Sequence, residues 1–195
     1  PAPDDVTTRL MREQINGQPM TDEELVSLLR NWTVGELATI SASISILTNY
    51  LAHHHELLNN LKAAPEQLPE AIDEILRMDA PLISNRRVTT REVEIGGRTI
   101  PAGEKITLLW ASANRDEDTF GNPDQFCPQQ NASQNLLYGA GIHVCPGAPL
   151  ARMELRVFME ELLKQIDTIE PVAGERPERA MFPTGGFNAL PLVFR

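Results

Sequence analysis

Cys145 is the residue whose surroundings most strongly suggest chemistry. It lies in residues 138–147, which read YGAGIHVCPG, with His143 two positions before it and Gly147 two positions after it. Glycines let a backbone approach a large flat group, and Pro146-Gly147 favours a helix start directly behind the cysteine. Amide N–H groups and the positive end of that helix would favour a thiolate. A thiolate offered singly, outside a cluster, suits the axial position of a haem iron.

Other interpretations of this cysteine are open. A lone cysteine is often a small buried hydrophobe. Zinc needs more ligands, but the other cysteine is Cys127, eighteen residues earlier, and the chain has no C-x-x-C pair. A Cys127–Cys145 disulfide is conceivable, although two cysteines in an acidic chain without a signal sequence favour a reducing compartment. No phosphate-binding G-x-x-x-x-G-K-[ST] loop is present. The spacing therefore favours the haem ligand.

The cysteine stretch resembles the haem-binding loop of the cytochrome P-450 family, F-G-x-G-x-H-x-C-x-G. Tyr138 stands in place of the phenylalanine, and the other specified positions match. The resemblance implies haem b (iron protoporphyrin IX) as the cofactor and Cys145 as its metal ligand. It further implies cofactor contacts by Tyr138, Gly139, His143, Pro146, Gly147 and Ala151.

Glu74 and Arg77 lie three residues apart, which places them on one face of a helix. By itself this spacing is most typical of a surface ion pair of little energetic value. The pair also resembles the E-x-x-R helix of the same family, where it is a buried structural anchor. Residues 114–128 resemble the segment that follows in that family, but Gln130 stands where an arginine completes a triad. A neutral amide can hydrogen-bond Glu74 but compensates its charge less well.

Two side chains are candidates for holding the haem propionates. Arg87 lies on an expected strand, and a guanidinium can clamp a carboxylate with two hydrogen bonds. The family resemblance favours Arg87 over an exposed strand charge. His143 is the second candidate, against the alternative that it packs within its loop.

Residues 32–39 occupy the place of the family's oxygen-activating helix, A-G-x-[DE]-T-[TS]. Gly35 fits the glycine of that pattern, but Leu37 and Ala38 fall where the acid and the proton-delivering threonine are expected. Glu36 and Thr39 lie one position off on each side, a rotation of about 100° on a helix. A π-type bulge could bring them back; otherwise protons come from substrate, water or another segment. Gly35, Glu36 and Thr39 are thus the catalytic candidates. The substrate-pocket candidates are Leu37, Ala38, Leu82, Ile83 and Phe187.

These side chains must be positioned by helices with a few short strands between them. Helical patterns cover residues 4–11, 21–54, 56–63, 69–78 and 150–166. Thr21 and Glu24 form a capping box, and residues 16–19 break the first two patterns apart. Short β-type runs cover residues 87–90, 93–95, 99–100, 105–108 and 190–194, whereas residues 111–134 look mostly irregular. We therefore expect one domain over residues 1–195, mainly α with small antiparallel β-sheets, as in the C-terminal half of the P-450 fold.

Composition excludes several classes of partner. A chain of 195 residues with 42% apolar and 23% charged residues is large enough to bury a core. A net charge of −10 disfavours nucleic acid, and no apolar run approaches the roughly 20 residues of a membrane span. The polar, acidic start and the absence of a signal sequence predict a cytoplasmic protein, and Pro1 in place of a methionine favours a trimmed product.

The resemblance runs over nearly the whole chain but covers only the C-terminal half of a P-450 of the soluble bacterial type. It implies an oxidoreductase, a haem-thiolate monooxygenase that activates dioxygen and inserts one oxygen atom into a small apolar organic substrate. The implied electron-transfer partner is a ferredoxin or flavoprotein that docks near Arg152 and Arg156. An N-terminal half that is missing here would be a further partner. The alternatives are a catalytically impaired haem-binding or apo fragment with a structural or regulatory role, and a haem-thiolate enzyme driven by peroxide.

Overall fold

A computed structural model of the chain describes residues 3–195. Pro1 and Ala2 lie outside the described residues, and with them the expectation of a trimmed product, which rests on Pro1. The chain divides into two compact units, Pro1–Ala38 and Thr39–Arg195, with the boundary inside the long helix α2 (Asp22–His53). The expectation of one domain over residues 1–195 stays a prediction.

The first unit starts with a short capped helix and a hairpin. Helix α1 (Val6–Leu10) is capped by Asp5, whose side chain accepts a 2.8 Å hydrogen bond from Thr8 N. Strands β1 (Gln14–Ile15) and β2 (Gln18–Pro19) pair in antiparallel fashion. The two turn residues have positive φ values, 53° at Asn16 and 76° at Gly17. Such an Asn-Gly pair is typical of a two-residue hairpin, so the expected break is a reversal of the chain.

The start of α2 confirms the capping box predicted from the sequence. Thr21 N donates to Glu24 Oε2 at 2.8 Å, and Glu24 N donates in return to Thr21 Oγ1 at 3.3 Å. Two backbone N–H groups at the helix start are thereby satisfied by side chains. From there the helix continues without a break to His53.

The second unit contains the rest of α2 and all the elements that follow it. Its other helices are α3 (His55–Ala63), α4 (Leu68–Met78), α5 (Trp110–Ala113), α6 (Glu117–Phe120), α7 (Pro128–Asn131) and α8 (Ala148–Gln165). Short 3-10 turns lie at Pro65–Gln67, Ala132–Gln134 and Gly141–His143. Its strands are β3 (Ser84–Val88), β4 (Val93–Ile95), β5 (Arg98–Ile100), β6 (Lys105–Leu109), β7 (Ile169–Pro171), β8 (Glu178–Arg179), β9 (Phe187–Ala189) and β10 (Leu192–Phe194).

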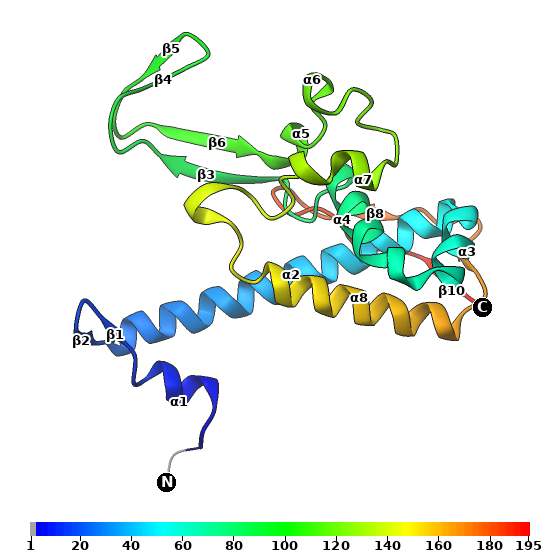
Figure 1. Ribbon diagram of the computed structural model, residues 1–195, viewed down its shortest axis with the longest axis horizontal. Helices are drawn as coiled ribbons and strands as arrows, with labels where there is room; N and C mark the ends of the chain where they lie inside the picture. The colour runs from blue at the N-terminus through cyan, green and yellow to red at the C-terminus, as the bar shows by residue number, and fades with distance from the viewer. Residues whose placement is uncertain (1–2) are drawn as a thin grey trace. The chain divides into compact units, whose positions relative to one another are not determined.

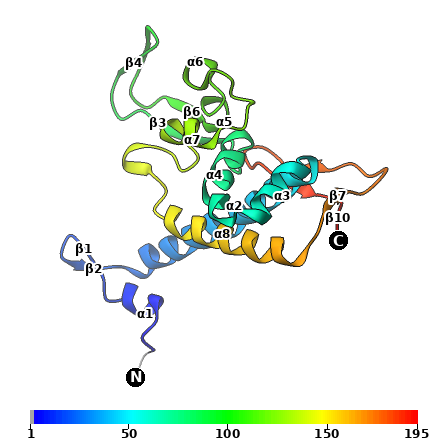
Figure 2. The same cartoon turned by 45° about the vertical axis from the view of Figure 1, so that its right-hand side comes forward.

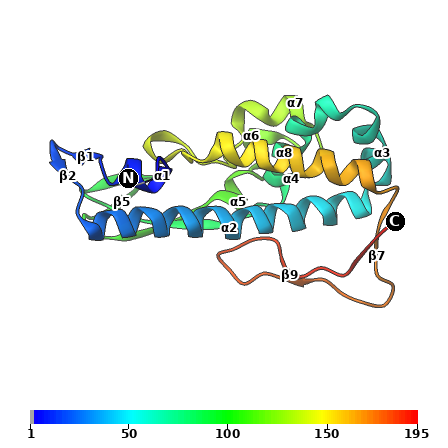
Figure 3. The ribbon, with the colours of Figure 1, turned by 90° about the horizontal axis from the view of Figure 1, so that it is seen from below.

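The core of this unit is helical. Helix α4 begins with Pro69 in its first turn, where proline is tolerated. Its apolar side chains recur at helical spacing, and Ala71, Ile72, Ile75 and Leu76 are buried. They join side chains from the end of α2, from α3 and from α8, where buried residues recur every fourth position at Leu155, Met159 and Leu163. Figure 3 shows α8 running alongside the end of α2.

The strands of the second unit pair as small antiparallel ladders (Figures 1 and 2). Strands β3 and β6 pair from Ser84↔Leu109 to Val88↔Lys105. Strand β4 pairs with β5, β7 with β10 and β8 with β9. The structure therefore confirms a mainly helical fold with small antiparallel sheets.

Two expectations about local structure were wrong. Residues 111–134 are not mostly irregular but contain α6, α7 and most of α5, each a helix of four residues. The β-type run expected at residues 87–90 lies earlier in the chain, as β3 (Ser84–Val88). Helix α8 begins at Ala148, directly after Pro146-Gly147, as the sequence predicts. Within the described part of the chain, no helix combines the length and apolar character that crossing a membrane requires.

Candidate haem-ligand loop and the buried network behind it

The Cys145 loop is closed by its own backbone. Cys145 N donates to Tyr138 O at 2.9 Å, and a 3-10 turn at Gly141–His143 fills the interval. Gly139 and Gly141 have φ values of 76° and 69°, in the left-handed region that favours glycine. The expected glycine positions are thus the points where this loop reverses.

Cys145 lies at the mouth of α8, as the sequence suggested. Ala148 N, the first residue of the helix, donates to Cys145 O at 3.2 Å, and Gly147 is the N-cap. A Cβ placed on Gly147 would lie 3.8 Å from Cys145 Sγ, in ordinary contact with it. Both Cys145 and Cys127 are free thiols, each half-buried.

The side chains of this loop fit a metal ion that is already coordinated by a macrocycle. Among residues 3–195 no group of three or more His, Cys, Asp or Glu side chains is placed to hold a metal ion. Beside Cys145 the loop instead presents apolar surface, because Ile142 is 97% and Val144 51% exposed. One thiol beside exposed apolar side chains and close-approach glycines suits a flat, apolar macrocycle that needs a single axial ligand.

The two propionate candidates are accessible. His143 is exposed, and Arg87 is half-buried on β3. Nη1 of Arg87 donates to Arg86 O at 2.8 Å, so the guanidinium lies along its own strand. Their roles stay predictions.

Behind the loop, α4 carries a buried ion pair. The side chains of Glu74 and Arg77 are 2% and 0% exposed, and they meet in a two-pronged contact of 2.8 Å and 3.0 Å. Such an Arg–carboxylate fork is among the stronger polar contacts in proteins. The surface alternative for this pair is therefore wrong, and the burial that the resemblance implied is observed.

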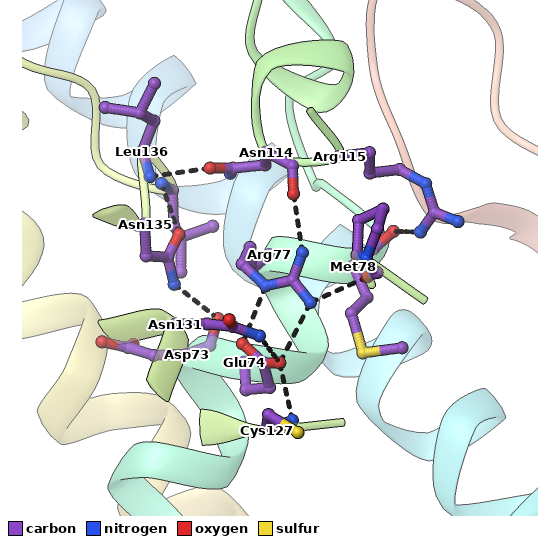
Figure 4. Close-up of polar contacts among 12 residues, drawn as sticks. Asp73, Glu74, Arg77, Met78, Asn114, Arg115, Cys127, Asn131, Asn135 and Leu136 are labelled. Atoms are coloured by element: carbon purple, nitrogen blue, oxygen red, sulfur yellow. Dashed lines mark hydrogen bonds and ion pairs between the residues drawn. The ribbon is translucent and has the colours of Figure 1, made fainter. Parts of the chain in front are cut away.

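Arg77 also ties α4 to the segment after α5. Its Nη1 donates to Asn114 O at 2.6 Å, its Nη2 donates to Pro123 O at 2.9 Å, and its guanidinium lies 4.8 Å from the ring centre of Phe120. Figure 4 shows Arg77 between Glu74 and Asn114. All the guanidinium nitrogens are thus engaged, which a buried arginine requires.

The third partner of Glu74 is not Gln130 but its neighbour. Gln130 is exposed, whereas Asn131 is buried and donates from Nδ2 to Glu74 Oε1 at 2.7 Å. The same oxygen accepts from Cys127 N at 3.0 Å. Burial alone would raise the pKa of Glu74, but the bonds from Arg77, Cys127 N and Asn131 outweigh it and hold that pKa below its ordinary value.

Sequence reasoning missed a second acidic contact on α4. Asp73 Oδ2 accepts from Arg152 of α8 at 2.9 Å to Nε and 2.8 Å to Nη2. The Arg152 guanidinium also lies 4.4 Å from the ring centre of Tyr138. Burial, with a smaller contribution from the charge of Asp73, raises the pKa of Tyr138 to about 12. The only sequence signal was a second carboxylate next to Glu74.

The pocket candidates of the second unit lie where three segments meet. Leu82 forms a bridge with Thr184, and Ile83 N donates to Pro183 O at 2.9 Å. Phe187 packs against the helical core, with Arg179 over its ring at 4.3 Å. A Cβ at Gly186 would lie 2.8 Å from Ser45 Oγ of α2, so the segment before Phe187 approaches that helix closely.

The oxygen-helix candidates lie on regular helix. Gly35, Glu36, Leu37 and Ala38 end the first unit and Thr39 begins the second, all within α2. The helix is α-helical throughout these residues, so the π-type bulge considered from the sequence is not formed. The catalytic assignment of Gly35, Glu36 and Thr39 stays a prediction.

Comparison with known proteins gives consistent matches. The family model described as "Cytochrome P450" matches residues 2–187. Steroid C26-monooxygenase of Mycobacterium tuberculosis is 34% identical over 98% of this chain and 52% of its own length. Linalool 8-monooxygenase of Pseudomonas putida is 35% identical over 95% of this chain and 45% of its own length.

Solved structures agree. The crystal structure of CYP109E1 from Bacillus megaterium in complex with testosterone matches with a TM-score of 0.87 and 27% identity, over 95% of this chain and 52% of that one. CYP108D1 from Novosphingobium aromaticivorans matches with a TM-score of 0.90 and 31% identity, over 99% of this chain and 47% of that one. The chain spans about half the length of the relatives it matches.

Proposed function

The chain belongs to the cytochrome P450 family, and from this premise we propose that it is the cysteine-bearing part of a haem-thiolate monooxygenase. The observation that carries the proposal is the half-buried thiol of Cys145, held by a loop with glycine turns at the start of α8 beside exposed apolar side chains. A bound haem would supply dioxygen activation and insertion of one oxygen atom into an organic substrate.

The chain's own residues would hold that group. Cys145 would supply the thiolate ligand, and Gly139 and Gly147 would allow close approach of the loop backbone. Arg87 and His143 are the proposed propionate partners. Further contacts would come from Tyr138, Pro146 and Ala151.

The proposed substrate is a small apolar molecule. Leu82, Ile83 and Phe187 supply half-buried apolar surface where the chain segments converge, and the relatives' names include a steroid and a linalool monooxygenase. The proposed electron donor is a ferredoxin or a flavoprotein. Two free thiols suit the reducing cytoplasm, which is the location we propose.

A second candidate is a haem-binding protein that turns over poorly. The observation that favours it is Leu37 and Ala38 on regular helix, where the family pattern has an acid and an alcohol. The two candidates differ in the product formed per reductant consumed. Turnover with peroxide in the absence of a reductase would instead identify a peroxide-driven enzyme.

Thiolate ligation is tested by replacing each cysteine in turn. Cys145→Ser should abolish the red-shifted Soret band of the reduced, carbon-monoxide-treated protein, because an oxygen ligand lacks the electron-donating sulfur on which that band depends. Cys127→Ser is the matched control and should leave the band unchanged. Loss of the band on Cys127→Ser, with retention on Cys145→Ser, would overturn the assignment.

A further inference from the structure

We propose that Asn131 is a positioning residue for the Cys145 loop, acting through its hydrogen bond to Glu74. The proposal rests on the proposed function in taking Cys145 as the haem ligand. Its geometry is local: Asn131 is 3% exposed, and its Nδ2 lies 2.7 Å from Glu74 Oε1 (Figure 4).

The position next to Asn131 cannot serve in its place. Consecutive residues on a helix point about 100° apart, and α7 is a single turn that ends at Asn131. With Asn131 directed at α4, Gln130 is exposed on the outside of that turn. The buried carboxylate of Glu74 is thus satisfied from position 131 and not from position 130.

The contact reaches Cys145 through a short tethered stretch. After Asn131, Asn135 Nδ2 donates to Asp73 O at 3.0 Å, and Leu136 N donates to Asn114 Oδ1 at 2.8 Å. The stretch then arrives at Tyr138, whose carbonyl accepts from Cys145 N. The Asn131–Glu74 bond is therefore the first of three hydrogen bonds that hold residues 131–138, the segment that leads into the Cys145 loop.

The donor character of the side chain is what matters. Glu74 faces Arg77 on its own helix, Cys127 and Asn131 from the α7 segment, and Tyr50 from α2. An aspartate at 131 would have nearly the same shape, but when ionised it can only accept. It would place a second negative charge against Glu74, which raises the pKa of both carboxyls.

The test compares Asn131→Ala and Asn131→Asp with Gln130→Ala and Gln130→Glu in the haem-loaded protein. The measurements are the unfolding equilibrium from pH 7 to about pH 4 and the share of bound haem that gives the red-shifted Soret band. We expect Asn131→Ala to lower the folded-to-unfolded ratio roughly ten- to a hundredfold, as for a lost bond to a charged group. Asn131→Asp should be worse at pH 7 and recover towards the alanine variant near pH 4, where carboxylates protonate.

At pH 7 the share of bound haem that gives the red-shifted band should be lower in Asn131→Ala than in the parent, and lower still in Asn131→Asp. The Gln130 variants should match the parent. An Asn131→Asp protein as stable as the parent at pH 7, or Gln130 variants with equal losses, would overturn the proposal. If Asn131→Asp does not fold at any pH, the red-shifted band of Asn131→Ala decides: a smaller share than in the parent supports the positioning role, and an equal share overturns it. A parent without the band overturns the proposed function, and this role with it. A parent band that no Asn131 variant changes overturns only the positioning role.

Discussion

Arg77→Ala should be among the most damaging single changes in the second unit. The side chain is fully buried and donates to both oxygens of Glu74 and to two backbone carbonyls, those of Asn114 and Pro123. Its removal leaves a buried carboxylate with only the donors from Cys127 and Asn131. It also opens a cavity beside Phe120.

The expected loss follows from these contacts. Removing one partner of a buried ion pair costs about 3–5 kcal/mol. Each backbone carbonyl left unsatisfied adds about 1–3 kcal/mol unless water reaches it. Even the lower figure is a large share of the roughly 5–15 kcal/mol that stabilises a domain. At about 2–4 °C per kcal/mol for a protein of this size, the thermal midpoint should fall by at least about 6 °C.

The assay is denaturant unfolding of matched variants, followed by tryptophan fluorescence at pH 7. Arg156→Ala is the control, because its pair with Glu160 lies at 3.7 Å and is 48% and 30% exposed, so it should cost under about 1 kcal/mol. Arg77→Lys should fall between parent and Arg77→Ala, since it keeps the charge but loses the fork. Arg77→Met with Glu74→Leu should cost less than the sum of the single changes, because no charge is left buried. An Arg77→Ala loss no larger than that of Arg156→Ala would refute this reasoning.

Three further outcomes are expected. The folded pKa of Glu74 is lowered, so its contribution to the free energy of unfolding is present above the ordinary glutamate pKa of about 4.3 and is lost as pH falls through the lower folded value. Glu74→Gln should therefore flatten the decline of stability with acid, measured by unfolding from pH 7 to pH 2. An unchanged slope would contradict this expectation. Gly186→Ala should lower the thermal midpoint more than Gly174→Ala. Both glycines have positive φ, but of the two only Gly186 has the Ala42 backbone 3.0 Å from the added Cβ. Equal shifts would exclude a steric clash with Ala42. Leu37→Asp with Ala38→Thr should raise the product formed per reductant consumed in the complete enzyme, and a parent-like ratio in a well-folded double variant would show that these positions do not limit proton delivery.

Helices were predictable from the sequence where apolar residues recur at helical spacing over several turns. The apolar spacing of α4 and its early proline predicted residues 69–78, and the structure forms Leu68–Met78. Helices α5, α6 and α7 were missed because a single turn leaves no period to read. The hairpin at Asn16-Gly17 was missed although that dipeptide is a strong turn signal. The β7–β10 pairing was missed because β7 has three residues, too few to show a β-type alternation.

The site was predictable only where its residues are local in sequence. The loop that carries Cys145 was identified from residue types at fixed spacing, and Glu74 and Arg77 from their helical interval. Burial of that pair depends on segments that arrive later in the chain. The Asn131–Glu74 contact joins residues 57 positions apart in the chain. The family pattern predicts the partner of Glu74 at Gln130, which precedes Asn131 by one residue and points about 100° away from it on a helix.

Helix α4 holds the Cys145 segment from both sides. Before the cysteine, Glu74 accepts from Asn131 and the backbone carbonyl of Asp73 accepts from Asn135. After it, the Asp73 carboxylate binds Arg152 on α8. Two adjacent acidic residues thus fix the chain upstream and downstream of one thiol. Because close-packed interiors transmit small displacements, loosening either contact should shift Cys145 even though neither acid touches it. Conversely, a haem on Cys145 would stabilise both contacts, since a ligand that binds only the folded arrangement favours every interaction that arrangement contains.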